Sequence, residues 1–146
     1  MLGLLAALFL LTVVIAIGLF ARASAQREQT GLPTNARIVY ADTGAWQKVE
    51  RPLFSRRYGL TGKPDYIVEV NSAVIPVEVK PNRTAPTPRE SDVMQLAAYG
   101  LLIEETLGQG HTAPPHGLLK YRDAVFQIGF TEELRARLID LMDAMR

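Results

Sequence analysis

Cysteine is absent from the 146-residue chain. Disulfide bonds, Cys-ligated zinc and thiolate-ligated iron–sulfur clusters are therefore excluded. Histidine is scarce as well, because His111 and His116 are the only two and both lie in the C-terminal half. The formal net charge is only +1, which argues against strong non-specific binding of nucleic acid by the chain as a whole.

The N-terminus holds one long uncharged apolar run, residues 1–21. Its length is about that of one bilayer crossing, so the run predicts a single transmembrane anchor. A cleaved signal peptide is the alternative, since Ala23-Ser24-Ala25 offers a small-residue cleavage site. However, no basic residue precedes the run, and the run exceeds the usual signal-peptide core. Arg22 and Arg27 follow it and favour a cytoplasmic location for the remainder of a single-pass membrane protein.

After the anchor, residues 22–35 are polar and lack an apolar period, which indicates a linker. Residues 36–146 then remain for one small domain. Because the domain is small, a binding partner or an oligomer could complete any substrate groove that it carries.

Two short stretches place acids where they could meet, namely Gly62-Lys63-Pro64-Asp65 and Pro76-Val77-Glu78-Val79-Lys80. If residues 65–70 and 73–80 are strands joined by a two-residue turn, Asp65 falls opposite Glu78. Side chains alternate along a strand, so Glu78 and Lys80 share a face. Carboxylate oxygens suit Mg²⁺ or Mn²⁺, and a nearby lysine suits an attacking water or phosphate oxygens. The pattern therefore predicts a hydrolytic metal site.

A plainer interpretation exists for each part of this pattern. An aspartate after a proline is often a turn residue, and a Glu and a Lys on one strand are often a solvated pair. The strand that ends at Lys80 is strongly apolar, however, and such strands lie centrally in a sheet, where an unpaired charge is expensive. Positive charge also collects nearby, because residues 22–89 hold eleven basic and six acidic side chains.

A helix is predicted over residues 90–107, with Gly108 ending it. Its expected buried face consists of Val93, Leu96, Ala97, Gly100, Leu101 and Leu107. Gln95 and Tyr99 lie about one turn apart and share a face, so both could reach a substrate backbone. Without the upstream acids, the two could equally decorate an amphipathic helix.

Short apolar segments complete the expected fold. Residues 37–40 predict a strand, residues 118–121 and 124–130 a hairpin, and a last helix begins near Thr131. That helix repeats apolar side chains at Leu134, Leu138, Leu141 and Met145. The expected fold class is α/β, with a small mixed sheet flanked by helices.

These motifs resemble the PD-(D/E)XK nuclease superfamily, and within it the RecB-type exonucleases, including CRISPR-associated ones. Gln95-Leu96-Ala97-Ala98-Tyr99 is similar to the Gln-x-x-x-Tyr motif that follows the catalytic lysine in RecB-type enzymes, and residues 117–121 are similar to the next strand. The matches span residues 58–121. The resemblance implies a restriction-endonuclease-like core. In it Asp65, Glu78 and the carbonyl of Val79 bind the metal, Lys80 acts on water and phosphate, and Gln95 and Tyr99 position DNA.

The implied activity is that of a Mg²⁺- or Mn²⁺-dependent deoxyribonuclease, and an exonuclease acting on single strands or DNA ends is favoured over a sequence-specific cutter. The sequence departs from the family in two ways. RecB-type nucleases usually carry a histidine or acid upstream of the first aspartate, for which only Asp42 and Glu50 are available. Many CRISPR-associated relatives hold an iron–sulfur cluster through four cysteines, which this chain lacks. No helicase or ATPase motif is present, so unwinding would need a protein partner.

Two other functions stay open. One is a catalytically degenerate domain that only binds nucleic acid or assists a membrane complex. The other is a membrane-tethered adaptor whose acidic C-terminal helix docks a protein partner, and its affinity for nucleic acid should be negligible and insensitive to salt.

Overall fold

The structure of the protein is a computed structural model that describes residues 37–38, 46–108 and 110–146. Contacts divide the chain into two compact units, residues 1–34 and residues 35–146. The predicted anchor and linker lie outside the described residues. Among the described residues, none of the helices has the length and apolar character needed to cross a membrane.

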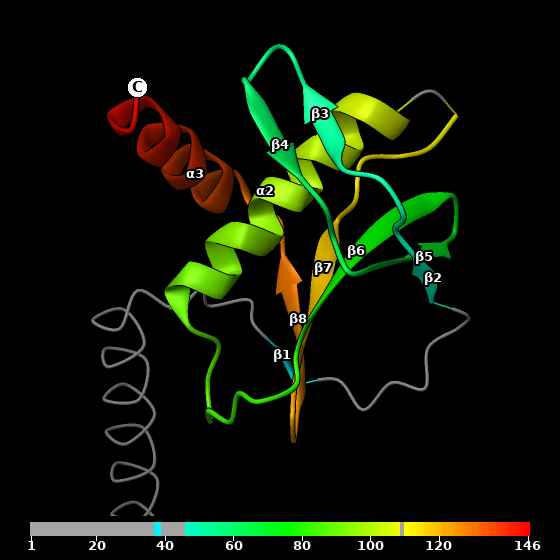
Figure 1. Cartoon of the computed structure of the whole chain (residues 1–146), viewed down its shortest axis with the longest axis vertical. Helices are drawn as coiled ribbons and strands as arrows, with labels where there is room; N and C mark the ends of the chain where they lie inside the picture. Colours follow the sequence, from blue (N-terminus) through cyan, green and yellow to red (C-terminus); the bar gives the residue numbers. More distant parts are fainter. Residues whose placement is uncertain (1–36, 39–45, 109) are drawn as a thin grey trace, which may run out of the picture. The chain divides into compact units, whose positions relative to one another are not determined.

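The second unit is a mixed α/β fold, as the sequence predicts (Figure 1). Six strands form one sheet in the order β1-β8-β7-β6-β5-β2, in which β6 and β7 are parallel and all other neighbours are antiparallel. The strands are β1 (Arg37–Ile38), β2 (Gln47–Lys48), β5 (Tyr66–Val70), β6 (Ala73–Lys80), β7 (His116–Tyr121) and β8 (Val125–Gly129). A separate hairpin pairs β3 (Leu53–Ser55) with β4 (Leu60–Gly62).

Helix α2 (Glu90–Leu107) connects the two parallel strands and lies across one face of the sheet. It contacts β6 and β7 beneath it, the β3–β4 hairpin on one side and α3 (Glu132–Ala144) on the other. Parallel neighbours need such a crossover connection, so the helix is required by the pairing of β6 with β7. The observed bounds of α2 coincide with the predicted range. Gly108 ends the helix with ordinary right-handed angles rather than a left-handed cap.

The two faces of the sheet bury different sets of side chains. On the α2 side, the larger cluster joins apolar residues of α2, α3, β7 and β8, including Leu96, Leu102, Leu119 and Ile128. On the opposite side, a smaller cluster contains Val68, Ala73, Ile75, Val77 and Leu118, with Trp46 and Tyr66 packed against it. The alternation along β6 therefore directs Glu78 and Lys80 toward α2.

Helix α3 begins as predicted, since the Thr131 side chain accepts a hydrogen bond from the Leu134 N–H at 3.2 Å. The predicted apolar face of this helix is wrong in its second half. Leu141 and Met145 are 44% and 71% exposed, whereas Met142 is buried together with Leu134 and Leu138. Helix geometry explains the error, because a 3.6-residue period places positions 141 and 142 on either side of the line that runs through Leu134 and Leu138.

Candidate metal-dependent nuclease site

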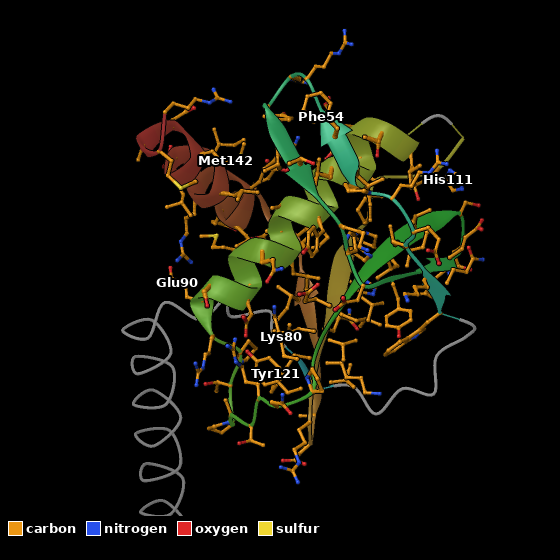
Figure 2. The ribbon with its side chains drawn as sticks, viewed as in Figure 1. Phe54, Lys80, Glu90, His111, Tyr121 and Met142 are labelled. Atoms are coloured by element: carbon orange, nitrogen blue, oxygen red, sulfur yellow. The ribbon has the colours of Figure 1, made fainter. Side chains whose placement is uncertain are left out.

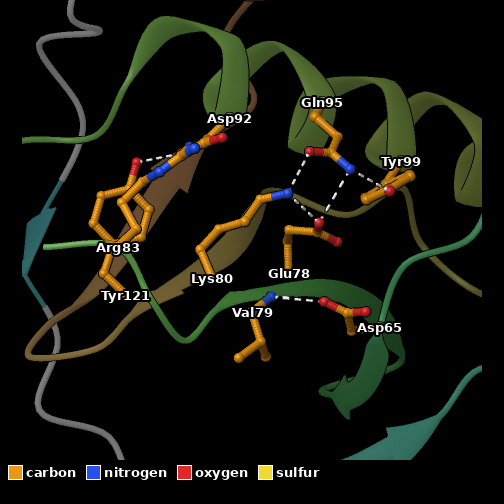
Figure 3. A network of polar contacts seen from close by, with 9 residues as sticks. All are labelled: Asp65, Glu78, Val79, Lys80, Arg83, Asp92, Gln95, Tyr99 and Tyr121. Atoms are coloured by element: carbon orange, nitrogen blue, oxygen red, sulfur yellow. Dashed lines mark hydrogen bonds and ion pairs between the residues drawn. The ribbon is translucent and has the colours of Figure 1, made fainter.

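The β5–β6 hairpin brings Asp65 next to Glu78. Val70 pairs with Ala73 and Tyr66 with Val77, so continuing the register sets Asp65, one residue before β5, opposite Glu78. The turn residues Asn71 and Ser72 both have positive φ, as a tight two-residue hairpin turn requires. The Val79 N–H donates to the Asp65 Oδ2 at 2.8 Å and thereby orients this carboxylate (Figure 3).

Glu78 is a buried acid in the middle of the sheet. Glu78 is 5% exposed, and its Oε1 lies 2.8 Å from the Lys80 Nζ. Burial raises the pKa of Glu78 and the adjacent Asp65 carboxylate raises it further, while Lys80 only partly offsets these effects. Two carboxylates and one ammonium leave a net negative charge in a partly buried position.

Gln95 of α2 bridges the acid and the lysine. Its Oε1 accepts from the Lys80 Nζ at 2.9 Å, and its Nε2 donates to the Glu78 Oε1 at 3.0 Å. The carbonyl end of the amide thus faces the ammonium and the amino end faces the carboxylate, which fits the donor and acceptor capacity of both partners. Figure 3 shows the three side chains closing one polar ring between β6 and α2.

Lys80 is held in its charged form. Burial by itself would lower the pKa of Lys80, but the hydrogen bond and the charge of Glu78 outweigh burial and raise the pKa. A lysine whose pKa is raised does not accept a proton at neutral pH. Its chemistry is therefore that of a hydrogen-bond donor and a positive charge beside the two acids.

Tyr99 holds the side-chain amide of Gln95 in place. It is 8% exposed, and its hydroxyl oxygen accepts a hydrogen bond from the Gln95 Nε2 at 2.7 Å. Burial raises the pKa of Tyr99, so the phenol stays neutral. The ring packs against Gly62, where an added Cβ would lie 2.9 Å from the Tyr99 Cε1. The predicted pair Gln95 and Tyr99 thus shares a face that is directed at Glu78 and Lys80.

A second polar cluster, which the sequence analysis missed, adjoins this site. Asp92 is 3% exposed and accepts from the Tyr121 hydroxyl at 2.5 Å, while Arg83 forms an ion pair with the same carboxylate. The Tyr121 oxygen in turn accepts from the Arg89 N–H at 2.9 Å. Burial alone would raise the pKa of Asp92, but the hydrogen bonds from Arg83 and Tyr121 outweigh it and lower the pKa. The spacing of Asp92 from Gln95 and Tyr99 places all three on one side of α2, which is the signal that could have revealed it.

Few side chains of the site could bind a metal ion. Asp65 and Glu78 supply hard oxygen ligands, and the described part of the chain holds no group of three or more His, Cys, Asp and Glu side chains arranged for a metal. Glu50 is exposed near the edge strand β2, where the neighbouring Val49 N–H donates to the Asp65 backbone oxygen at 3.2 Å. The other upstream candidate, Asp42, lies outside the described residues.

Comparison with known proteins assigns no class to this site. No protein-family model matches the chain, and a search of curated proteins returns no match. The chemistry of the site is therefore argued from its own residues.

Proposed function

We propose that the protein is a divalent-metal-dependent DNA nuclease that hydrolyses phosphodiester bonds of single strands or DNA ends. The observation that carries the proposal is the ring of Glu78, Lys80 and Gln95, with Asp65 held beside it by the Val79 N–H. In it, Glu78 and Lys80 share one face of the central strand β6, and Asp65 lies beside them just before β5. The resemblance to RecB-type exonucleases supports the choice of DNA as substrate.

The residues present fit a divalent cation. Asp65 and Glu78 carry two negative charges against the single positive charge of Lys80, and the raised pKa of Glu78 reflects burial beside a second acid. A divalent cation supplies Lewis-acid activation of phosphate and water when it is bound. Mg²⁺ and Mn²⁺ both suit these oxygen donors, with the Val79 carbonyl as a further candidate ligand.

Each side chain then has a defined task. Asp65 and Glu78 hold the cation at the end of the hairpin. Lys80 donates to a phosphate oxygen or to the attacking water and stabilises negative charge as it develops on the phosphate. Gln95 fixes the Lys80 ammonium in place, and Tyr99 fixes Gln95.

The test is cleavage of labelled single-stranded DNA with Mn²⁺, with Mg²⁺ or with chelator. Asp65→Ala and Glu78→Ala are expected to abolish metal-dependent cleavage, because each removes a charged ligand. Glu69→Ala is the matched control, since Glu69 is an exposed acid of the same hairpin, paired at 3.9 Å with His111. Cleavage that persists in chelator, or in both site variants, would refute the proposal.

A catalytically degenerate binder of nucleic acid is the second candidate. Such a domain fits the described residues, in which Asp65 and Glu78 have no third His, Cys, Asp or Glu grouped with them for a metal. Titration with Mn²⁺ separates the two functions, because a degenerate site should bind no Mn²⁺ that depends on Asp65 and Glu78. Single-stranded DNA should then bind without being cut.

A further inference from the structure

The β3–β4 hairpin and its flanks carry positive charge without any acid. Residues 51–63 contain four basic side chains and no Asp or Glu, and all four are exposed: Arg51, Arg56, Arg57 and Lys63. Arg57 pairs with Glu105 at 3.3 Å and lies over the Tyr58 ring. In the described part of the chain, Arg51, Arg56 and Lys63 make no ion pair. Three charges are thus available to an anionic ligand.

The same hairpin exposes an aromatic ring. Strand alternation turns Leu53 and the buried Ser55 inward, while Phe54 points outward opposite Thr61 and is 55% exposed. Single exposed apolar residues are common and need no explanation by themselves. Phe54 is different, because it is close in sequence to three basic side chains that make no ion pair among the described residues, and an aromatic face flanked by positive charge is the combination that binds single-stranded nucleic acid.

The hairpin is joined directly to the candidate site. Gly62, the last residue of β4, packs against the Tyr99 ring, and the chain then reaches Asp65 through Lys63 and Pro64. Figure 2 shows Phe54 on the hairpin in the upper part of the view, with Lys80 and Tyr121 in the lower part. A strand bound along the hairpin would therefore lie next to the segment that leads into Asp65.

We propose that the β3–β4 hairpin is the docking surface for single-stranded DNA, with one base stacked on Phe54 and the adjacent phosphates bound by Arg56 and its basic neighbours. The inference rests on the proposed nuclease function and specifies which substrate enters the site. An unpaired base offers a free face to Phe54, whereas the bases of a duplex are already stacked on one another. The low net charge of the chain is compatible with this role, because residues 51–63 hold four basic side chains and no acid.

The experiment measures binding and cleavage separately on the full-length chain, kept in non-ionic detergent because residues 1–21 are apolar. Binding of a fluorescent oligothymidine of about 20 nucleotides, which covers at least one typical site, is followed by anisotropy in chelator. Phe54→Ala is expected to weaken binding about 5- to 150-fold, the range of one lost stacking contact. Phe54→Trp should restore it. Leu141→Ala, which truncates an exposed apolar residue of α3, is the matched control and should leave binding unchanged.

Charge is tested through the salt dependence of the same binding. Arg56→Ala should reduce the slope of log affinity against log salt by about 0.7, the value for one phosphate contact on a single strand. Arg122→Ala removes an exposed positive charge next to Tyr121 and should leave the slope unchanged. A blunt duplex should bind more weakly than the single strand and should not respond to Phe54→Ala.

The outcomes separate the two proposals. If Phe54→Ala weakens binding and Phe54→Trp restores it, the hairpin binds single strands, whether or not any variant cleaves DNA. If the parent cleaves DNA with Mn²⁺ but Phe54→Ala binds like the parent, the hairpin proposal is overturned while the nuclease proposal stands. The hairpin proposal would also be overturned if Arg56→Ala and Arg122→Ala reduced the salt slope equally. It would be overturned as well if Phe54→Ala weakened binding of the duplex as much as binding of the single strand.

Discussion

Asp92 offers a sharp test of how α2 is fixed over the site. Asp92→Ala removes the acceptor of the Tyr121 hydroxyl and the partner of Arg83, both at a buried carboxylate. A hydrogen bond to a charged group contributes about 1.5–3 kcal/mol, and the half-buried Arg83 is a partner of the same carboxylate. We therefore expect Asp92→Ala to lower the free energy of unfolding by about 2–3 kcal/mol at pH 7. Asp92→Asn, which keeps an acceptor for the hydroxyl, should cost about 1 kcal/mol less.

The effect of Asp92 should depend on pH in one direction. Because the pKa of Asp92 is lower in the folded state than its ordinary value near 3.8, the ionised carboxylate stabilises the fold above that value. This stabilisation is lost as pH falls through the lowered folded-state pKa. Protonated Asp92 then resembles Asn, so the difference between the parent and Asp92→Asn should be full at pH 7 and should shrink below about pH 3.8.

Urea unfolding of residues 35–146 provides the measurement. Trp46 is the only tryptophan and packs against Tyr66 at 5.7 Å between ring centroids, so its fluorescence reports unfolding from a part of the fold that the substitution does not touch. The control is Asp143→Asn, an exposed acid of α3 paired only with Arg146 among the described residues. The reasoning would be refuted by an unchanged urea midpoint in Asp92→Ala. It would also be refuted if the difference in unfolding free energy between the parent and Asp92→Asn stayed constant from pH 7 to pH 3.

Five further predictions concern the site and the N-terminus. Glu78→Gln should abolish metal-dependent cleavage, because it removes one of the two charged ligands. Saturating Mn²⁺ should stabilise the parent by about 2.7 kcal/mol at one hundred times its dissociation constant, but not Glu78→Gln. Lys80→Ala should keep this Mn²⁺ stabilisation while lowering turnover in single-turnover assays. Tyr99→Phe should weaken DNA affinity or positioning by about 1 kcal/mol, the value of one lost hydrogen bond. Deleting residues 1–25 should give a soluble protein with unchanged cleavage, whereas the full chain should resist salt extraction from membranes, and release by high salt would contradict the anchor.

Local sequence patterns predicted the elements around the site well. The Asn71-Ser72 turn fixes the hairpin register, because a two-residue turn pairs Val70 with Ala73. The length and apolar period of α2 defined both of its ends. Gln95 and Tyr99 then share a face by helix geometry alone, so their proximity to the acids follows once α2 crosses the sheet.

Features that depend on distant contacts were missed. Asp92 resembles an ordinary acid in the first turn of a helix, and its burial results from Arg83 and Tyr121, which lie 9 and 29 residues away. The β3–β4 hairpin was also missed, because its strands are only three residues long and its turn lacks an Asn-Gly or Asp-Gly signal. The glycine at position 59 was the one local indication in the sequence of a tight turn there, and in the structure its φ is 58°.

The arrangement of the site follows from one topological requirement. β6 ends at Lys80 and pairs with β7 in parallel, so the chain must cross the sheet between them. The crossover is made by α2, and it covers the face that carries Glu78 and Lys80 because Val77 and Val79 occupy the other. An apolar helix on that face would leave a buried acid and a half-buried ammonium with unmet hydrogen-bonding capacity. Gln95 meets both at once and Tyr99 holds Gln95, so replacing Gln95 by Leu should misplace Lys80 even though no ligand is removed. Loss of turnover with intact Mn²⁺ binding in Gln95→Leu would support this coupling, and unchanged turnover would show that Lys80 is positioned by Glu78 alone.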